Sequence, residues 1–115
     1  MSTASYIKEI LILTELTAGW DGPGSLAISE QVVQNTFACL NGVVDVACLE
    51  ATPEPNGTVS IEWEILESQT SIHLQVGLTT ASMYIRQAGH ETAYFNFKDI
   101  HVSPVSVSKE VNPYL

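Results

Sequence analysis

Hydrophobic periodicity changes from helical to alternating near the middle of this 115-residue chain. After residue 58, apolar and polar residues alternate in four short segments, and this places the apolar side chains of each extended segment on one face. The apolar members are Val59, Ile61, Trp63 and Ile65, then Ile72, Leu74 and Val76, then Met83 and Ile85, and finally Ala93, Phe95 and Phe97. Because the connections are short, the pattern predicts an antiparallel meander buried on one face.

The first part of the chain shows helical spacing and capping signals instead. We expect a helix over residues 4–18, ended by a glycine-rich turn at residues 19–25. Ser29 is a suitable N-cap for a second helix, and Asn41-Gly42 is a suitable end for it. Residues 43–49 are ambiguous between a helical extension and a strand.

These elements predict an α+β fold in which two N-terminal helices pack on one face of a four- to five-stranded antiparallel meander sheet. We expect the chain to form a single domain, residues 1–115. Residues 4–42 form its helical part, and 57–98 its sheet. A Pro-rich connector at residues 52–57 joins the two, and 99–115 form an extended tail or edge strand. The second face of the sheet would then be open.

The charge distribution bears on the function. The chain has 13 acidic and 4 basic residues, a net charge of −9, and no Lys or Arg between Lys8 and Arg86. Such a charge argues against direct binding of nucleic acid and against docking on anionic membranes. The sequence shows neither a secretory signal nor a membrane-spanning stretch, which favours a cytoplasmic protein. Solubility is an equally good reason for the acidity.

The open sheet face is the best candidate for a site. If the first hairpin turns at residues 67–70, Glu64 lies across from His73 and Glu62 across from Gln75; the second hairpin then brings Arg86 beside His73. The predicted partner-binding residues combine this face with the nearby acids: Glu50, Glu54, Glu62, Glu64, Glu67, His73, Tyr84, Arg86 and Tyr94. Acid–base catalysis or a metal held by two carboxylates and an imidazole is the alternative use.

The sequence contains no strong catalytic, metal-binding or cofactor-binding motif, so we assign no catalytic residue, metal or cofactor. Trp20, Asp21 and Gly22 are expected to form a structural loop in which Asp21 accepts backbone N–H bonds of its own turn, with a functional carboxylate as the alternative. Cys39 and Cys48 are expected to be buried thiols, and one disulfide between them is the alternative.

The order of these features resembles a group of uncharacterised small bacterial and phage proteins. The likeness rests on Gly19-Trp20-Asp21-Gly22, on the Pro53 and Pro55 connector, and on the strand segment Ile61-Glu62-Trp63, and it spans about residues 6–85. The group commonly has a proline before its second helix, where this chain has Ile28-Ser29. The resemblance implies a similar arrangement of elements and carries no activity.

From charge and size we predict a non-catalytic acidic protein that binds and inhibits another protein. A phage anti-defence inhibitor that imitates nucleic acid, of the anti-CRISPR kind, or an antitoxin would fit, with a basic nucleic-acid-binding protein as partner. One alternative is a module that forms homodimers or larger oligomers. Another is a small-molecule-binding protein or an enzyme that uses the open sheet face.

Overall fold

The computed structural model describes residues 3–44 and 49–115. Helices precede and follow a five-stranded antiparallel sheet of order β1-β2-β3-β4-β5. The helices are α1 (Thr3–Leu11), η1 (Ile12–Glu15), α2 (Glu30–Leu40), α3 (Ser108–Val111) and η2 (Asn112–Tyr114), where η is a 3₁₀ helix. The strands are β1 (Leu49–Pro53), β2 (Val59–Ile65), β3 (Thr70–Val76), β4 (Ala81–Gln87) and β5 (Ala93–Phe97). The predicted α+β class and the antiparallel meander are confirmed.

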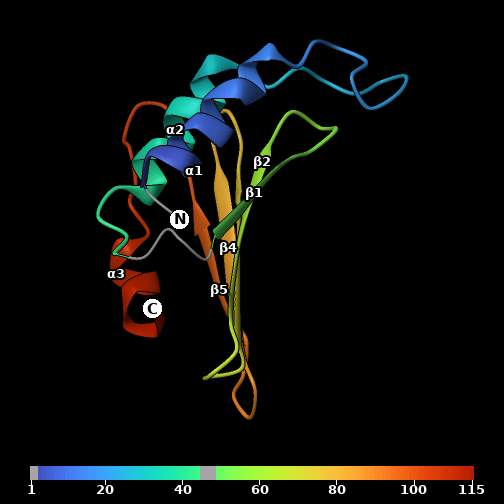
Figure 1. Ribbon diagram of the computed structural model, residues 1–115. Helices are drawn as coiled ribbons and strands as arrows, with labels where there is room; N and C mark the ends of the chain where they lie inside the picture. The colour runs from blue at the N-terminus through green and yellow to red at the C-terminus, as the bar shows by residue number, and fades with distance from the viewer. Residues whose placement is uncertain (1–2, 45–48) are drawn as a thin grey trace.

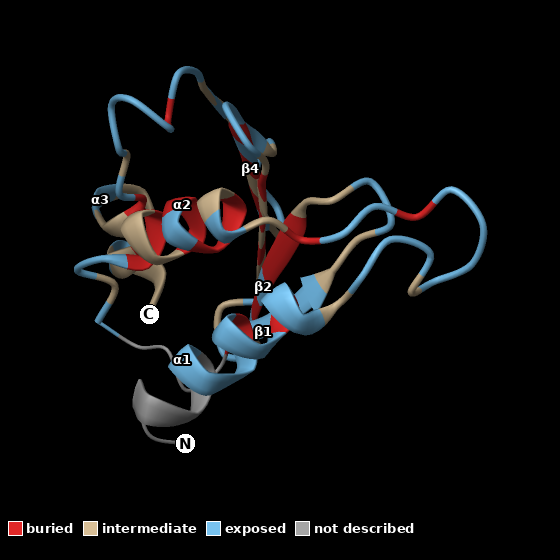
Figure 2. Ribbon diagram, turned by 90° about the horizontal axis from the view of Figure 1, so that it is seen from above, coloured by how far each residue is buried: buried red, intermediate tan, exposed pale blue. Residues whose placement is uncertain are grey.

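The hydrophobic core lies on one side of this sheet. Figure 1 shows α1, α2 and α3 on the same side of the strands. The core cluster combines helix residues such as Val32 and Leu40 with the inward side chains of the strands, among them the fully buried Trp63. Figure 2 shows the buried positions on α2 and along the strands. Burial of such alternating apolar residues is the main stabilising contribution to a sheet of this kind.

The first helix is shorter than the sequence predicts. The α-helix ends at Leu11 and tightens into the 3₁₀ helix η1, and Leu16 is already extended with φ −73° and ψ 121°. The hydroxyl of Thr14 donates to the carbonyl of Leu11 at 2.9 Å, so a side chain competes for a backbone acceptor of the helix. The expected helix over residues 4–18 is therefore wrong in its last turn.

Helix α2 begins and ends where the sequence predicts. The Ser29 side chain accepts a hydrogen bond from the backbone N–H of Val32 at 3.2 Å, which caps the first turn. At the other end Asn41 is extended, and Gly42 follows with φ +84°, a conformation that favours glycine.

Two other expectations are wrong. Residues 49–53, partly assigned to a connector, form the edge strand β1, in which Pro53 takes the last position. Residues 99–115 form no edge strand. Residues 108–114 are helical instead, and they lie on the same side of the sheet as α1 and α2 (Figure 1). The fully buried Val107 and Val111, four residues apart, explain the helix, because that spacing places both on one helical face against the core.

Candidate protein-binding face

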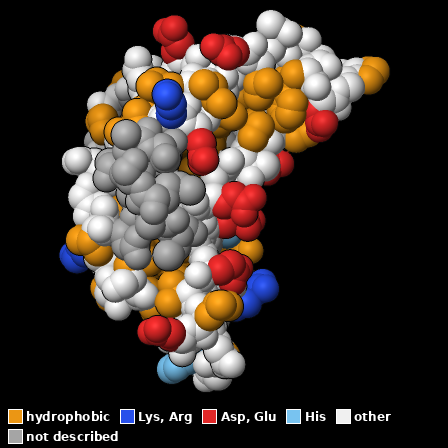
Figure 3. All heavy atoms as spheres, in the orientation of Figure 1, with side chains coloured by type: hydrophobic (Ala, Val, Ile, Leu, Met, Phe, Trp, Pro, Cys, Tyr) orange, Lys and Arg blue, Asp and Glu red, His pale blue; other side chains and the backbone are white. Residues whose placement is uncertain are grey.

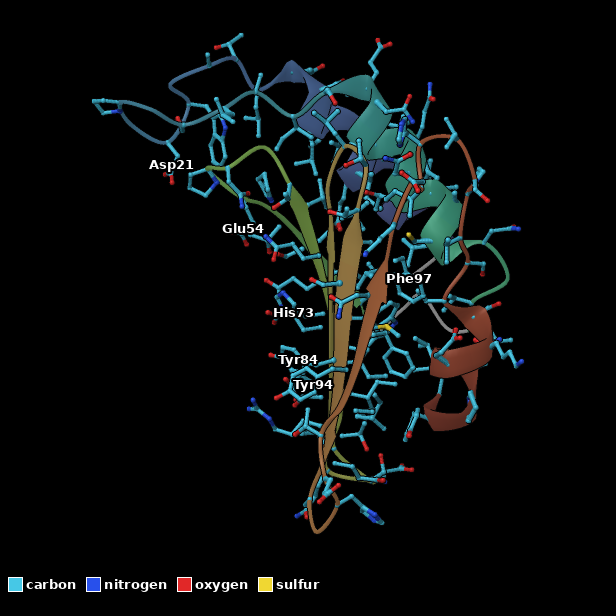
Figure 4. All side chains as sticks on the ribbon, turned by 180° about the vertical axis from the view of Figure 1, so that it is seen from behind. Asp21, Glu54, His73, Tyr84, Tyr94 and Phe97 are labelled. Atoms are coloured by element: carbon cyan, nitrogen blue, oxygen red, sulfur yellow. The ribbon has the colours of Figure 1, made fainter. Side chains whose placement is uncertain are left out.

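The strand register aligns one outward-facing residue from each strand in a single line across the sheet. Glu50 is paired with Glu62, Glu62 with His73, His73 with Tyr84, and Tyr84 with Tyr94. We call these five residues the cross-strand row. The row lies on the face turned away from the helices, called here the open face. Figure 4 shows His73, Tyr84 and Tyr94 projecting from it, whereas Phe97 points toward the helices.

This register corrects the predicted one by two residues. Glu62, and not Glu64, lies opposite His73, and Tyr84, and not Arg86, follows in β4. The β2–β3 turn sets the first pairing, because it closes at Leu66–Gln69 through a 3.2 Å backbone hydrogen bond rather than at residues 67–70. The β3–β4 turn sets the second, because it closes where the N–H of Gly77 donates to the carbonyl of Thr80 at 2.9 Å. An even shift leaves every side chain on its predicted face.

From Glu62 to Tyr94 the row forms a chain of direct contacts. The Nδ1 atom of His73 lies 3.1 Å from Oε1 of Glu62. The imidazole stacks on the ring of Tyr84, with centroids 5.3 Å apart and planes 5° from parallel. Tyr84 and Tyr94 meet at 6.5 Å with an angle of 57° between their rings. Aromatic pairs at such distances stabilise a sheet surface and hold the rings in defined orientations.

Glu64 and Arg86 flank the row without joining it. Both carboxylate oxygens of Glu64 accept from the Ser71 hydroxyl, at 3.0 and 2.9 Å. The guanidinium carbon of Arg86 lies 5.3 Å from the Tyr84 ring centroid, a cation–π arrangement. Of the three residues of the alternative catalytic or small-molecule site, Glu64 has a partner of its own in Ser71, whereas His73 and Arg86 both lie against the Tyr84 ring.

The predicted acids of the site belong to one half of the sheet. Glu50 and Glu62 are direct cross-strand neighbours, two like charges within about 5.5 Å between Cα atoms. Glu64 follows on β2, while Glu54 lies in the turn before that strand and Glu67 in the turn after it. Figure 3 shows acidic side chains along the sheet margin, and others over the helical end. The open face therefore changes from acidic on β1 and β2 to aromatic on β3–β5.

Two shallow hollows adjoin the aromatic half. The smaller, about 100 Å³, is bordered by His73, Tyr84 and Tyr94, and the larger, about 340 Å³, contains Gln75, Asn96 and neighbouring residues. Neither hollow has an acidic side chain in its lining. Over residues 3–44 and 49–115, no group of three His, Cys, Asp or Glu side chains is placed to hold a metal ion.

The Gly-Trp-Asp-Gly loop is held by residues other than the predicted one. Asp21 is exposed, and its backbone N–H donates to the Ser25 hydroxyl at 3.0 Å. That hydroxyl donates in turn to the carbonyl of Gly22 at 2.8 Å, so Ser25 fills the capping role expected of Asp21. The Trp20 indole N–H donates to the carbonyl of Leu26 at 2.7 Å. In the sequence, the sign of this role is a serine directly after three closely spaced glycines, and the structure shows that this serine is buried.

The loop also contacts the sheet through its backbone. The N–H of Leu26 donates to the carbonyl of Pro55 in the β1–β2 turn at 2.7 Å. Figure 4 shows Asp21 and Glu54 toward the same end of the sheet. This end is remote from the aromatic residues of the cross-strand row.

Of the two cysteines, the structure describes Cys39. It is buried in α2, and this burial raises the pKa of its thiol from 9.0 to about 11. Burial disfavours the charged thiolate, so Cys39 is a core residue rather than a nucleophile. The alternative, a disulfide between Cys39 and Cys48, involves Cys48, which lies outside the described residues.

Comparison with protein-family models, with curated proteins and with solved structures found no match. The resemblance to small bacterial and phage proteins therefore stays a prediction. None of the helices in the described part of the chain is long and apolar enough to cross a membrane.

Proposed function

We propose that this protein is a non-catalytic acidic protein that binds a basic partner protein through the open face of its sheet and inhibits it. The proposal includes the arrangement in which the two N-terminal helices pack on the opposite face. The observation that carries it is the cross-strand row, which combines two adjacent carboxylates and three contacting aromatic rings on one exposed surface.

The aromatic half supports binding by contact area. Tyr94 is 73% exposed, although its ring is oriented by Tyr84. Tyrosine and arginine are enriched among the residues that contribute most to protein–protein affinity. A ring already held in place loses little conformational entropy on binding, so Tyr84, Tyr94 and Arg86 together form a favourable anchor.

The acidic half supports selection of a basic partner. Glu50 and Glu62 repel each other in the unbound protein, and a Lys or Arg of the partner between them would relieve this repulsion. Glu62 and Glu64 lie two residues apart on one strand, about 6.8 Å by strand geometry. A regular line of anions suits a groove that normally binds nucleic-acid phosphates, as in an anti-CRISPR-like inhibitor or an antitoxin.

Binding tests can separate this surface from net charge alone. The double variant Glu50→Gln/Glu62→Gln removes two charges from the row, and Glu9→Gln/Glu15→Gln removes two from the exposed side of α1 and η1. Proteins captured from a cell extract on the immobilised chain are compared among the variants, at low and high salt. We expect the row variant to lose the partner, the helix variant to retain it, and high salt to release it.

A competition assay tests the inhibitory role. If the captured protein binds nucleic acid, a labelled duplex should be displaced by the wild-type chain and much less by the row variant. Equal retention of the partner by both double variants would contradict recognition through the open face. Simultaneous binding of the duplex and the chain would contradict mimicry.

A further inference from the structure

The two edges of the sheet differ in the backbone groups that they present. In an antiparallel pair, alternate residues direct their N–H and C=O toward the neighbouring strand. The N–H of Ala88 donates to the carbonyl of Gln69 at 3.2 Å, and the N–H of Gly77 donates to that of Thr80 at 2.9 Å. Both bonds lie in the β3–β4 register, so even-numbered residues of β4 face β3 and odd-numbered ones face β5.

This alternation determines which groups of β5 are directed outward. The odd-numbered residues of β4 pair with Ala93, Phe95 and Phe97, whose backbone groups therefore bond to β4. The N–H and C=O of Tyr94 and Asn96 consequently point away from the sheet. Within the described residues, no backbone hydrogen bond other than the ladder with β4 reaches this strand.

The β1 edge is protected by comparison. The N–H of Glu54 donates to the carbonyl of Thr58 at 2.9 Å, so even-numbered residues of β1 face β2 and odd-numbered ones face outward. Pro53 is one of the outward positions, and it has no N–H to offer. Glu50 and Glu54 also place negative charges at this edge. Proline and charge are common means of preventing a strand edge from pairing with another chain.

We infer that the β5 edge pairs with the β5 edge of a second copy, which joins the two sheets into one. The strand Ala93–Phe97 contains no charge and no proline, so it lacks both protections found on β1. An antiparallel pair centred on Phe95 places Tyr94 opposite Asn96 of the second copy. The two residues of this pair exchange two backbone hydrogen bonds. The two-fold symmetry adds a second, equivalent pair in which Asn96 lies opposite Tyr94 of the second copy.

The side chains of strand β5 itself suit a second copy of this chain. Approach through β1 would bring Glu50 and Glu54 of two negatively charged chains together, whereas β5 carries no acid. On the helix side, the parallel rings of Phe95 and Phe97 are only half-buried, with centroids 6.5 Å apart. Pairing would bring Phe95 next to its copy and cover more of both rings.

The pairing has a consequence for the open face. A two-fold axis through Phe95 runs perpendicular to the sheet, so the open faces of both copies lie on the same side. The two cross-strand rows then meet through Tyr94 and Asn96. The result is one continuous surface with an aromatic centre and an acidic flank at each end. This inference rests on backbone geometry, and it holds whether or not the open face binds a protein.

Sedimentation equilibrium of the full chain, from micromolar to near-millimolar concentration, tests the inference. A five-residue pair is smaller than a standard interface, so we expect a reversible dimer that dissociates on dilution. Asn96→Pro removes an outward N–H and leaves the β4 ladder intact, and it should raise the dimer dissociation constant at least about tenfold. Ala51→Pro, at an outward position of β1, is the matched control and should leave that constant unchanged.

Amide exchange of the wild-type chain gives a readout that needs no variant. The N–H groups of Tyr94 and Asn96 should exchange more slowly as concentration rises, and that of Ala51 should not change. Circular dichroism verifies that both proline variants fold. A monomer at every concentration, equal weakening by both prolines, or concentration-independent exchange at Tyr94 and Asn96 would each overturn the inference.

Discussion

Asn35 connects helix α2 to the β3–β4 turn, and its replacement by alanine tests how this helix is held. The side chain is 4% exposed. Its amide nitrogen donates to the carbonyls of Gly77 at 2.9 Å and Leu78 at 3.0 Å, while its oxygen accepts from the Gln31 amide at 2.8 Å. Asn35→Ala removes all three hydrogen bonds at once.

The expected loss of stability follows from these contacts. Each hydrogen bond contributes about 0.5–1.5 kcal/mol to the free energy of unfolding. Alanine offsets part of the loss, because its helix propensity exceeds that of asparagine by roughly 0.6 kcal/mol. Water also offsets part of the loss, because it reaches the turn carbonyls of the half-buried Gly77 and the exposed Leu78 when the asparagine is removed. We therefore expect a destabilisation of about 2 kcal/mol.

Urea denaturation followed by circular dichroism measures this loss. For a small domain, a decrease of about 2 kcal/mol lowers the urea midpoint by roughly 1 M without changing the slope. Gln34→Ala is the control, because Gln34 is the exposed neighbour of Asn35 on the same helix. If Asn35→Ala stays within about 0.5 kcal/mol of the wild type, these hydrogen bonds do not hold α2 to the turn.

Two further predictions concern the loop and the buried thiol. Ser25→Ala should lower the free energy of unfolding in urea by about 1–2 kcal/mol, because two loop hydrogen bonds are lost. Asp21→Ala should lower it by less than about 0.5 kcal/mol. The opposite order would show that Asp21, and not Ser25, caps the loop. Burial raises the pKa of Cys39 from 9.0 to about 11, so above pH 9 the unfolded chain loses a proton that the folded chain keeps, and stability falls as the pH rises toward 11. Cys39→Ala should remove this part of the pH dependence, and an unchanged slope of unfolding free energy against pH would refute the assignment.

The sheet was the most predictable part of the fold. Alternation in residues 59–97 correctly separated inward from outward side chains on β2, β3 and β4, because alternation is a local property of an extended chain. The sequence does not predict all of edge strand β1, because Pro53 is typical of a connector between elements. An outward position on an edge strand nevertheless accepts proline. The C-terminal helix was missed because Pro104 and Pro113 suggested an extended tail.

The candidate site was predictable in its members but not in its contacts. The alternation places His73, Tyr84 and Tyr94 on the open face, yet the alignment of His73 with Glu62 depends on where the β2–β3 turn closes. Gln69 adopts φ +50° at the end of that turn, a conformation uncommon for a residue other than glycine. No pattern in the sequence marked this residue as the end of the turn.

The amino-acid sequence alone thus determined which residues share a face and how strongly acidic the chain is, because both follow from residue order and residue type. Only the tertiary structure decided that Glu50, Glu62, His73, Tyr84 and Tyr94 stand in one line, because pairing between distant strands depends on the exact length of each turn. It likewise decided that the β5 edge offers its hydrogen-bonding groups while Pro53 interrupts the β1 edge, since the direction of each N–H is set by the neighbouring strand.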